Sequence, residues 1–124
     1  MANGALKVLV LGVGNMGRSH ALAYHKIDGF EIAGLCSPGI HGRKELPNEL
    51  GDYPKYTDFT AALAETKPDV VSINTYPDSH AEFCRQAFDA GCHVFTEKPL
   101  ATTVADAQKI IDMAKAANKK LVIG

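Results

Sequence analysis

Three glycines near the start of the chain have a spacing that suits the binding of a dinucleotide. Gly12, Gly14 and Gly17 form a G-x-G-x-x-G pattern directly after an apolar run. The first glycine permits a tight turn, the second leaves room for a pyrophosphate, and the third lets a helix pack close to the strand. The alternative is a structural turn that binds nothing. The predicted cofactor-binding residues of this turn are Gly12, Gly14, Asn15, Met16 and Gly17.

A lysine later in the chain has a sequence context that favours chemistry. Lys98 lies between Glu97 and Pro99, directly after the apolar stretch 92–96. An ammonium group held near a reacting hydroxyl or carbonyl stabilises the negative charge that develops on its oxygen. Glu97 would orient Lys98 or anchor the loop. The alternative is a solvated lysine in a turn. The position of Lys98 between Glu97 and Pro99, after a strand, favours the chemical role.

The elements that must position these residues alternate along the chain. Strands are expected at residues 8–11, 31–36, 55–57, 70–75, 92–96 and 121–124, and helices at 18–26, 58–66, 80–90 and from 104, with a short one near 45–50. Strand–helix alternation implies right-handed crossovers. The sequence therefore predicts an α/β fold, a doubly wound and mostly parallel Rossmann sheet with helices on both faces.

Ligands of such sheets bind where the strands end, so the segments that follow strands are the candidate site. Besides the glycine turn and the Lys98 loop, they include Thr75, Tyr76 and Pro77 after the fourth strand. Ser37 follows the second strand, where an acidic residue would bind the ribose 2′-hydroxyl of NAD. Its hydroxyl, with Arg43 as a nearby cation, favours NADP over NAD. The alternative is that Ser37 only ends a strand and Arg43 lies in a solvated loop.

Composition excludes several classes of function. The formal net charge is -1, which gives no electrostatic basis for binding nucleic acid or a membrane surface. No apolar run approaches the roughly 20 residues of a membrane span, and no secretory signal is visible. Cys36, Cys84 and Cys92 lack C-x-x-C spacing, so we expect no metal site and no disulfide. Free thiols suit a cytoplasmic protein.

The order of these motifs resembles the Gfo/Idh/MocA oxidoreductases, named after glucose–fructose oxidoreductase, inositol dehydrogenase and a rhizopine-catabolism protein. The resemblance covers the whole chain and rests on the glycine turn with His20, the T-Y-P-D-S-H stretch at 75–80, and Glu97-Lys98-Pro99. It implies that residues 1–124 are an NAD(P)-binding Rossmann domain. It also implies hydride transfer between nicotinamide and a sugar, inositol or related polyol, with Lys98 contacting the nicotinamide ribose and the substrate oxygen.

The resemblance also indicates what the sequence lacks. Members of the family share a second, sheet-rich domain that holds the substrate and a D-x-x-x-H pair, and the full-length proteins commonly assemble as homo-oligomers through it. That domain is absent from these 124 residues. A non-catalytic NAD(P)-binding sensor or regulatory module is therefore the alternative function, although retention of Lys98 argues against it.

Two residues of the 75–80 stretch need separate comment. Tyr76 stands where the family usually has proline, so we expect a reshaped loop whose aromatic ring lies against the cofactor. His80 is included among the predicted cofactor-site residues because it completes the motif. It also lies on an apolar stripe of the predicted helix, and a packed, hydrogen-bonded histidine is favoured over a direct ligand.

Overall fold

The fold, taken from a computed structural model that describes residues 5–38, 40 and 47–124, is a parallel α/β sheet. Within this part of the chain six parallel strands follow the order β3-β2-β1-β4-β5-β6. Their bounds are β1 Leu6–Leu11, β2 Phe30–Cys36, β3 Lys55–Tyr56, β4 Val70–Ile73, β5 His93–Thr96 and β6 Leu121–Ile123. This is the strand order of a Rossmann fold, and it confirms the predicted fold class.

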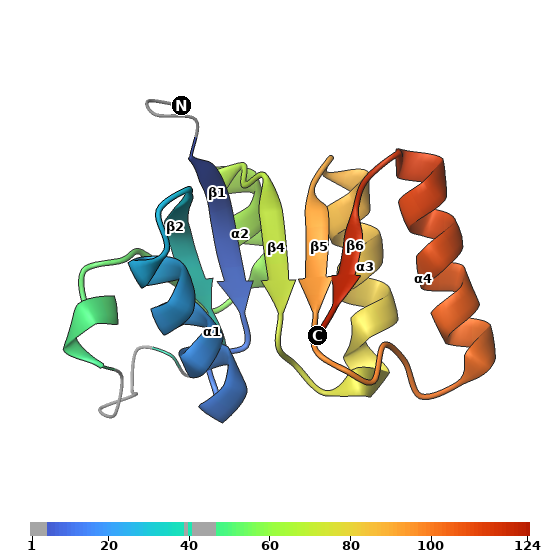
Figure 1. The fold of residues 1–124 in the computed structure, drawn as a ribbon, viewed down its shortest axis with the longest axis horizontal. Coiled ribbons are helices and arrows are strands. Elements are labelled where there is room, and N and C mark those ends of the chain that lie inside the picture. The colour runs from blue at the N-terminus through green and yellow to red at the C-terminus, as the bar shows by residue number, and fades with distance from the viewer. Residues whose placement is uncertain (1–4, 39, 41–46) are drawn as a thin grey trace.

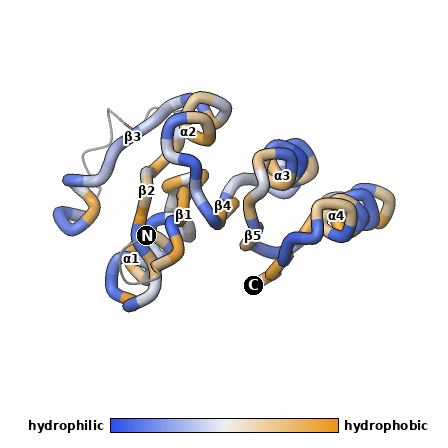
Figure 2. Tube along the Cα trace, turned by 90° about the horizontal axis from the view of Figure 1, so that it is seen from above, coloured by the Kyte–Doolittle hydropathy of each residue, from blue (hydrophilic) through white to orange (hydrophobic). Residues whose placement is uncertain are grey.

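The helices are divided unequally between the two faces of the sheet. They are α1 Asn15–Lys26, α2 Phe59–Thr66, α3 His80–Asp89 and α4 Val104–Ala117, with short 3-10 turns η3 Asn48–Leu50 and η4 Pro77–Ser79. Viewed from above, α1 lies on one side of the sheet, and α2, α3 and α4 lie on the other (Figure 2). In Figure 1 the labelled strands point downward, so the loops that follow them gather along the lower edge, called here the carboxyl edge.

Strand β1 is buried on both faces, which explains its unbroken apolar sequence. Val8 and Val10 belong to the core beneath α1, whereas Leu9 and Leu11 belong to the core beneath the other helices. Alternate residues of a strand point to opposite faces. All four side chains are at most 3% exposed, so the central strand anchors both cores.

The face that carries α1 has an open apolar groove beyond that helix. The groove has a volume of about 520 Å³ and is lined by residues of α1 and of strands β4 to β6, including Tyr24, Phe95 and Val122. Among the described residues no helix covers β5 and β6 on this side (Figure 2).

Element boundaries differ from the sequence-based expectations in two informative places. Helix α1 begins at Asn15 rather than at Arg18, because the glycine turn itself forms the first helical turn; the Arg18 N–H donates to the Gly14 carbonyl at 2.8 Å. Strand β4 ends at Ile73 rather than at Thr75. The last paired position of β4 is Ile73 opposite Thr96.

The helix start predicted at residue 104 is confirmed. The Thr103 side chain accepts a hydrogen bond from the Asp106 N–H at 3.1 Å, the bond expected of a capping residue. Asp58 caps α2 in the same way, accepting from the Ala61 N–H at 3.0 Å. No helix of the described residues is both long enough and apolar enough to cross a membrane.

Candidate functional site

The glycine turn has a geometry that two of its glycines make possible. Gly12 has a φ of +84°, and a Cβ built on it would lie 2.8 Å from the Asn74 carbonyl oxygen. A Cβ on Gly17 would lie 1.7 Å from the Gly12 carbonyl oxygen. Any side chain at either position would collide with backbone, so these two glycines are required by the fold itself.

Gly14 is different, because no packing requires it. It has ordinary extended backbone angles, and among the described residues nothing lies within 4 Å of a Cβ built on it. Within the part of the chain that the structure describes, the space next to Gly14 is therefore open. A glycine at such a place keeps the backbone accessible, which is what close approach of a pyrophosphate needs.

Among the described atoms, no side chain caps the N-terminus of α1. Gly14 is the N-cap and gives no side-chain capping bond, and the first turn of the helix contains no acidic residue. Uncapped N–H groups and the positive end of the helix dipole favour an anion at this position. The turn and the helix start together fit the phosphates of a dinucleotide.

The end of β2 is packed more tightly than the sequence suggested. Ser37 is 5% exposed; its N–H donates to the Tyr56 carbonyl, and its own carbonyl accepts from the Ile40 N–H. Contact between the Ser37 hydroxyl and a ribose stays a prediction. Arg43, the other predicted determinant of the ribose site, lies outside the described residues.

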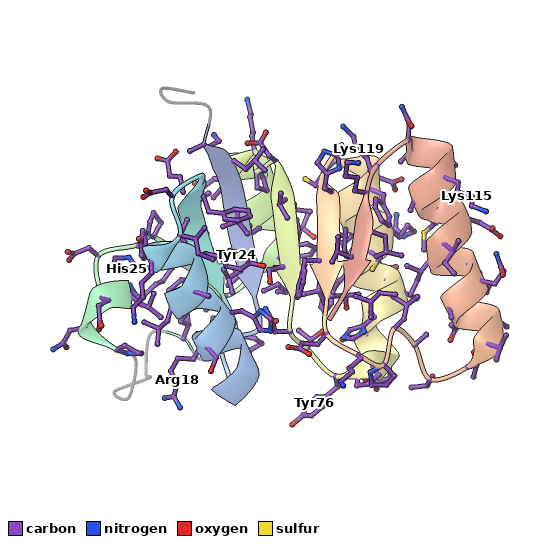
Figure 3. The ribbon with its side chains drawn as sticks, viewed as in Figure 1. Arg18, Tyr24, His25, Tyr76, Lys115 and Lys119 are labelled. Atoms are coloured by element: carbon purple, nitrogen blue, oxygen red, sulfur yellow. The ribbon has the colours of Figure 1, made fainter. Side chains whose placement is uncertain are left out.

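The loop after β4 brings three predicted residues to the carboxyl edge. The Thr75 and Ser79 hydroxyls are 2.5 Å apart, and the Ser79 hydroxyl donates to the Tyr76 carbonyl at 2.6 Å. Pro77 begins η4. The Tyr76 side chain is 84% exposed and points away from the sheet at this edge (Figure 3). Its ring is free to meet a ligand.

The Lys98 loop reaches the same edge from β5 and is tied to β4, to α1 and to the residue that follows β6. The Glu97 N–H donates to the Ile73 carbonyl at 3.1 Å, and the Glu97 carboxylate contacts Nε2 of His20 on α1. The Lys98 N–H donates to the Gly124 carbonyl at 3.4 Å. The peptide bond between Lys98 and Pro99 is cis. The Lys98 side chain itself is exposed.

His80 lies beneath these two loops. Its side chain is fully buried. Nε2 is 2.9 Å from the Thr75 carbonyl oxygen, and Nδ1 is 3.0 Å from the Leu100 carbonyl oxygen. This geometry matches the packed, hydrogen-bonded interpretation of His80, since the ring reaches no open surface.

Asn74 is a site residue that the sequence reasoning missed. It lies directly against both required glycines. Its amide nitrogen donates to the Ser72 carbonyl and hydroxyl oxygens, each at 3.2 Å, and Ser72 also accepts from the Tyr24 hydroxyl at 3.1 Å. Its Oδ1 is buried with no hydrogen-bond partner among the described atoms. The available signal was a polar residue where an apolar strand ends.

Other chemistry finds little support in the part of the chain that the structure describes. No group of three or more His, Cys, Asp or Glu side chains there could hold a metal ion. Cys36, Cys84 and Cys92 are free and buried, and burial raises the pKa of their thiols to about 11, 12 and 11. Such thiols are poor nucleophiles near neutral pH.

Comparison with known proteins places these features in context. Residues 6–124 match the model of the Gfo/Idh/MocA proteins, described as an oxidoreductase family with an NAD-binding Rossmann fold. The chain is 32% identical to a D-glucoside 3-dehydrogenase of Escherichia coli K12, over 98% of this chain and 35% of that protein.

Two solved structures show the same fold. A UDP-N-acetylglucosamine 3-dehydrogenase from Acidithiobacillus ferrooxidans is 32% identical with a TM-score of 0.84, covering 97% of this chain and 38% of that one. A myo-inositol 2-dehydrogenase from Lactobacillus plantarum is 26% identical with a TM-score of 0.86, covering 97% and 36%. The chain thus spans well under half the length of each of these relatives.

Proposed function

Because the chain belongs to the Gfo/Idh/MocA family of oxidoreductases, we propose that it is the dinucleotide-binding domain of an NAD(P)-dependent dehydrogenase. Its substrate is a sugar, an inositol or a related polyol. The relatives named above are dehydrogenases of such compounds, which favours catalysis over a sensor. The observation that carries the proposal is the open space at Gly14, in front of an uncapped helix start.

In this proposal the residues of the carboxyl edge have different roles. The backbone of residues 12–17 and the N–H groups of α1 hold the pyrophosphate. Thr75, Tyr76 and Pro77 line the neighbouring part of the site. A bound nicotinamide supplies the hydride acceptor or donor. Lys98 contacts the nicotinamide ribose and places its ammonium against the substrate oxygen, where it stabilises the negative charge that forms.

For the cofactor we propose NADP rather than NAD. Residue 37, at the end of β2, is a serine and carries no charge to repel a 2′-phosphate. Arg43 supplies the balancing cation. The carboxylate of Asp58 is near the end of β2, since it contributes to the raised pKa of Cys36. It caps α2, however, so we do not assign it the role of the acidic residue that binds the ribose of NAD.

Further parts of the proposal concern the whole enzyme. A second domain would hold the substrate and supply the main acid or base, and the complete protein would assemble as a homo-oligomer. We place it in the cytoplasm because its three cysteines are free and buried. The resemblance to the family supports the first two points.

Calorimetric titrations with NADPH and NADH test the proposal directly. We expect NADPH to bind more tightly, and Arg43→Ala to weaken NADPH by about tenfold through loss of a charge-assisted hydrogen bond. Arg85→Ala is the matched control, since Arg85 forms exposed ion pairs with Glu82 and Asp89 on α3. Equal affinities would overturn the NADP preference. Binding of neither nucleotide would overturn the dinucleotide assignment.

A further inference from the structure

A buried histidine joins the two loops that carry the proposed active-site residues. His80 is the first residue of α3 and is fully buried. The rest of its stripe on the helix is apolar and buried, comprising Cys84, Ala87 and Phe88. An apolar side chain would suit that position on packing grounds alone. The presence of an imidazole here is therefore explained by the hydrogen bonds of its ring nitrogens.

Each ring nitrogen of His80 faces the backbone of a different loop. Nε2 lies 2.9 Å from the carbonyl oxygen of Thr75, which follows β4. Nδ1 lies 3.0 Å from the carbonyl oxygen of Leu100, which follows β5, and 3.3 Å from the Thr96 hydroxyl. A carbonyl oxygen only accepts hydrogen bonds and a neutral imidazole carries one N–H, so the ring donates to the Leu100 carbonyl in its Nδ1–H tautomer and to the Thr75 carbonyl in its Nε2–H tautomer. Without the ring, the carbonyl that accepts this bond would lose its partner in a partly buried place, which costs about 1–3 kcal/mol.

The contact at Leu100 bears directly on Lys98. Only Pro99 separates the two residues, and the ring of proline fixes its φ angle. On the other side of Lys98, the Glu97 N–H is bonded to Ile73 and the Glu97 carboxylate to His20. The exposed Lys98 side chain thus extends from a backbone that is held on both sides. The contacts before Lys98 are made by Glu97, and the contact after it, at the Leu100 carbonyl, is made by His80.

We propose that His80 is a positioning residue that sets the place of Lys98 relative to the Thr75 loop, and so acts on cofactor binding through Lys98. This rests on the proposed function of the Lys98 loop. A His80 that merely fills the core would affect folding but not Lys98 in particular. The two roles make different predictions when both residues are changed.

A double-mutant cycle separates the roles. NADPH affinity is measured by fluorescence for the wild-type chain, His80→Ala, Lys98→Ala and the double variant. We expect each single variant to bind about tenfold more weakly, from loss of a charged or buried polar contact. We expect the double variant to bind no more weakly than Lys98→Ala, because a misplaced loop no longer matters once the ammonium is gone.

Two conservative variants and one control complete the design. His80→Gln places an amide nitrogen near the position of Nε2, and His80→Asn near that of Nδ1, so each keeps one loop contact. We expect His80→Asn, which retains the Leu100 contact, to recover more affinity than His80→Gln. Cys84→Ala removes a fully buried group from the same stripe and should bind like wild type. Circular dichroism confirms that each variant is folded.

The outcomes distinguish the inference from the function beneath it. Additive losses in the cycle, or wild-type affinity in His80→Ala, would overturn the positioning role while leaving dinucleotide binding intact. If His80→Ala does not fold, the Asn and Gln variants decide, and equal affinity of both with wild type would overturn it. Failure of the wild-type chain to bind NADPH or NADH would overturn the proposed function and the inference together.

Discussion

The glycine turn and the Lys98 loop lie at the same edge of one sheet, yet they are held in place by different means. The turn is fixed by backbone: Gly17 has no room for a Cβ beside the Gly12 carbonyl, and Gly12 has a positive φ. The Lys98 loop is fixed by contacts with distant elements, His20 on α1 and His80 on α3 among them. One part of the site is thus a local backbone structure and the other a tertiary assembly.

This difference predicts how each part responds to change. A turn fixed by its backbone tolerates no added side-chain atom where two backbone segments are in contact. It tolerates an added atom where no other atom is near. A loop held by side chains should instead lose its geometry in steps, as each contact is removed. The following experiments are ordered by the size of the expected effect.

The largest effect should come from a single methyl group in the glycine turn. Gly17→Ala would place a Cβ against the Gly12 carbonyl oxygen, and because backbone cannot move aside we expect a loss of at least about 3 kcal/mol in the free energy of unfolding. Urea denaturation followed by circular dichroism measures the loss.

Gly14→Ala is the matched control, with the same added methyl group in open space. It should change stability by no more than about 1 kcal/mol, the cost of alanine at an N-cap. It should nevertheless weaken binding of NADPH, since the methyl group would occupy the proposed pyrophosphate position. Equal destabilisation by the two variants would show that the contrast between them is wrong.

The same contrast explains what the sequence could and could not predict. The turn was predictable because Gly12, Gly14 and Gly17 lie within six residues of one another and each glycine has a local reason. The burial of His80 followed from its place on the apolar stripe. Its partners Thr75 and Leu100 did not, since they lie in separate loops and are contacted through backbone oxygens that carry no residue-specific signal.

Boundaries failed for a related reason. Helix α1 begins at Asn15 because the Gly14 carbonyl accepts the first helical hydrogen bond, and a glycine gives no sign of this in the sequence. Asn74 was missed because its significance depends on contact with Gly12, in the turn after β1, and with Gly17 on α1. Cofactor preference also depends on the tertiary placement of residues, here Ser37 and Arg43, which a local motif does not encode.

Two buried cysteines can report separately on the two parts. Cys36 ends β2 and its carbonyl accepts from the Gly12 N–H, whereas Cys84 lies one helical turn beyond His80. Burial raises the pKa of Cys36 to about 11, with a further contribution from Asp58, and that of Cys84 to about 12. At pH 8 only about one Cys36 thiol in a thousand should be ionised in the folded chain.

We therefore expect neither thiol to react with a disulfide reagent at pH 8 unless the chain opens locally. His80→Ala should speed labelling of Cys84 more than that of Cys36, measured by mass spectrometry of the digested protein. Both folded-state pKa values exceed the usual value of 9.0, so ionisation of these thiols favours the unfolded chain. Their contribution to the free energy of unfolding is fully present below about pH 9. It is lost as the pH rises from 9 toward 11 and above. Rapid labelling of both thiols in the folded wild-type chain would contradict the prediction.

The smallest effect on stability should come from Tyr76, whose side chain is mostly exposed. Its ring is 84% exposed, so Tyr76→Ala should change the free energy of unfolding by less than about 0.5 kcal/mol. If the ring lies against the cofactor, the same variant should weaken NADPH several-fold, since an aromatic contact contributes about 0.5–1.5 kcal/mol. Tyr76→Phe keeps the ring and should bind like wild type. Unchanged affinity in Tyr76→Ala would overturn the expected contact between this ring and the cofactor.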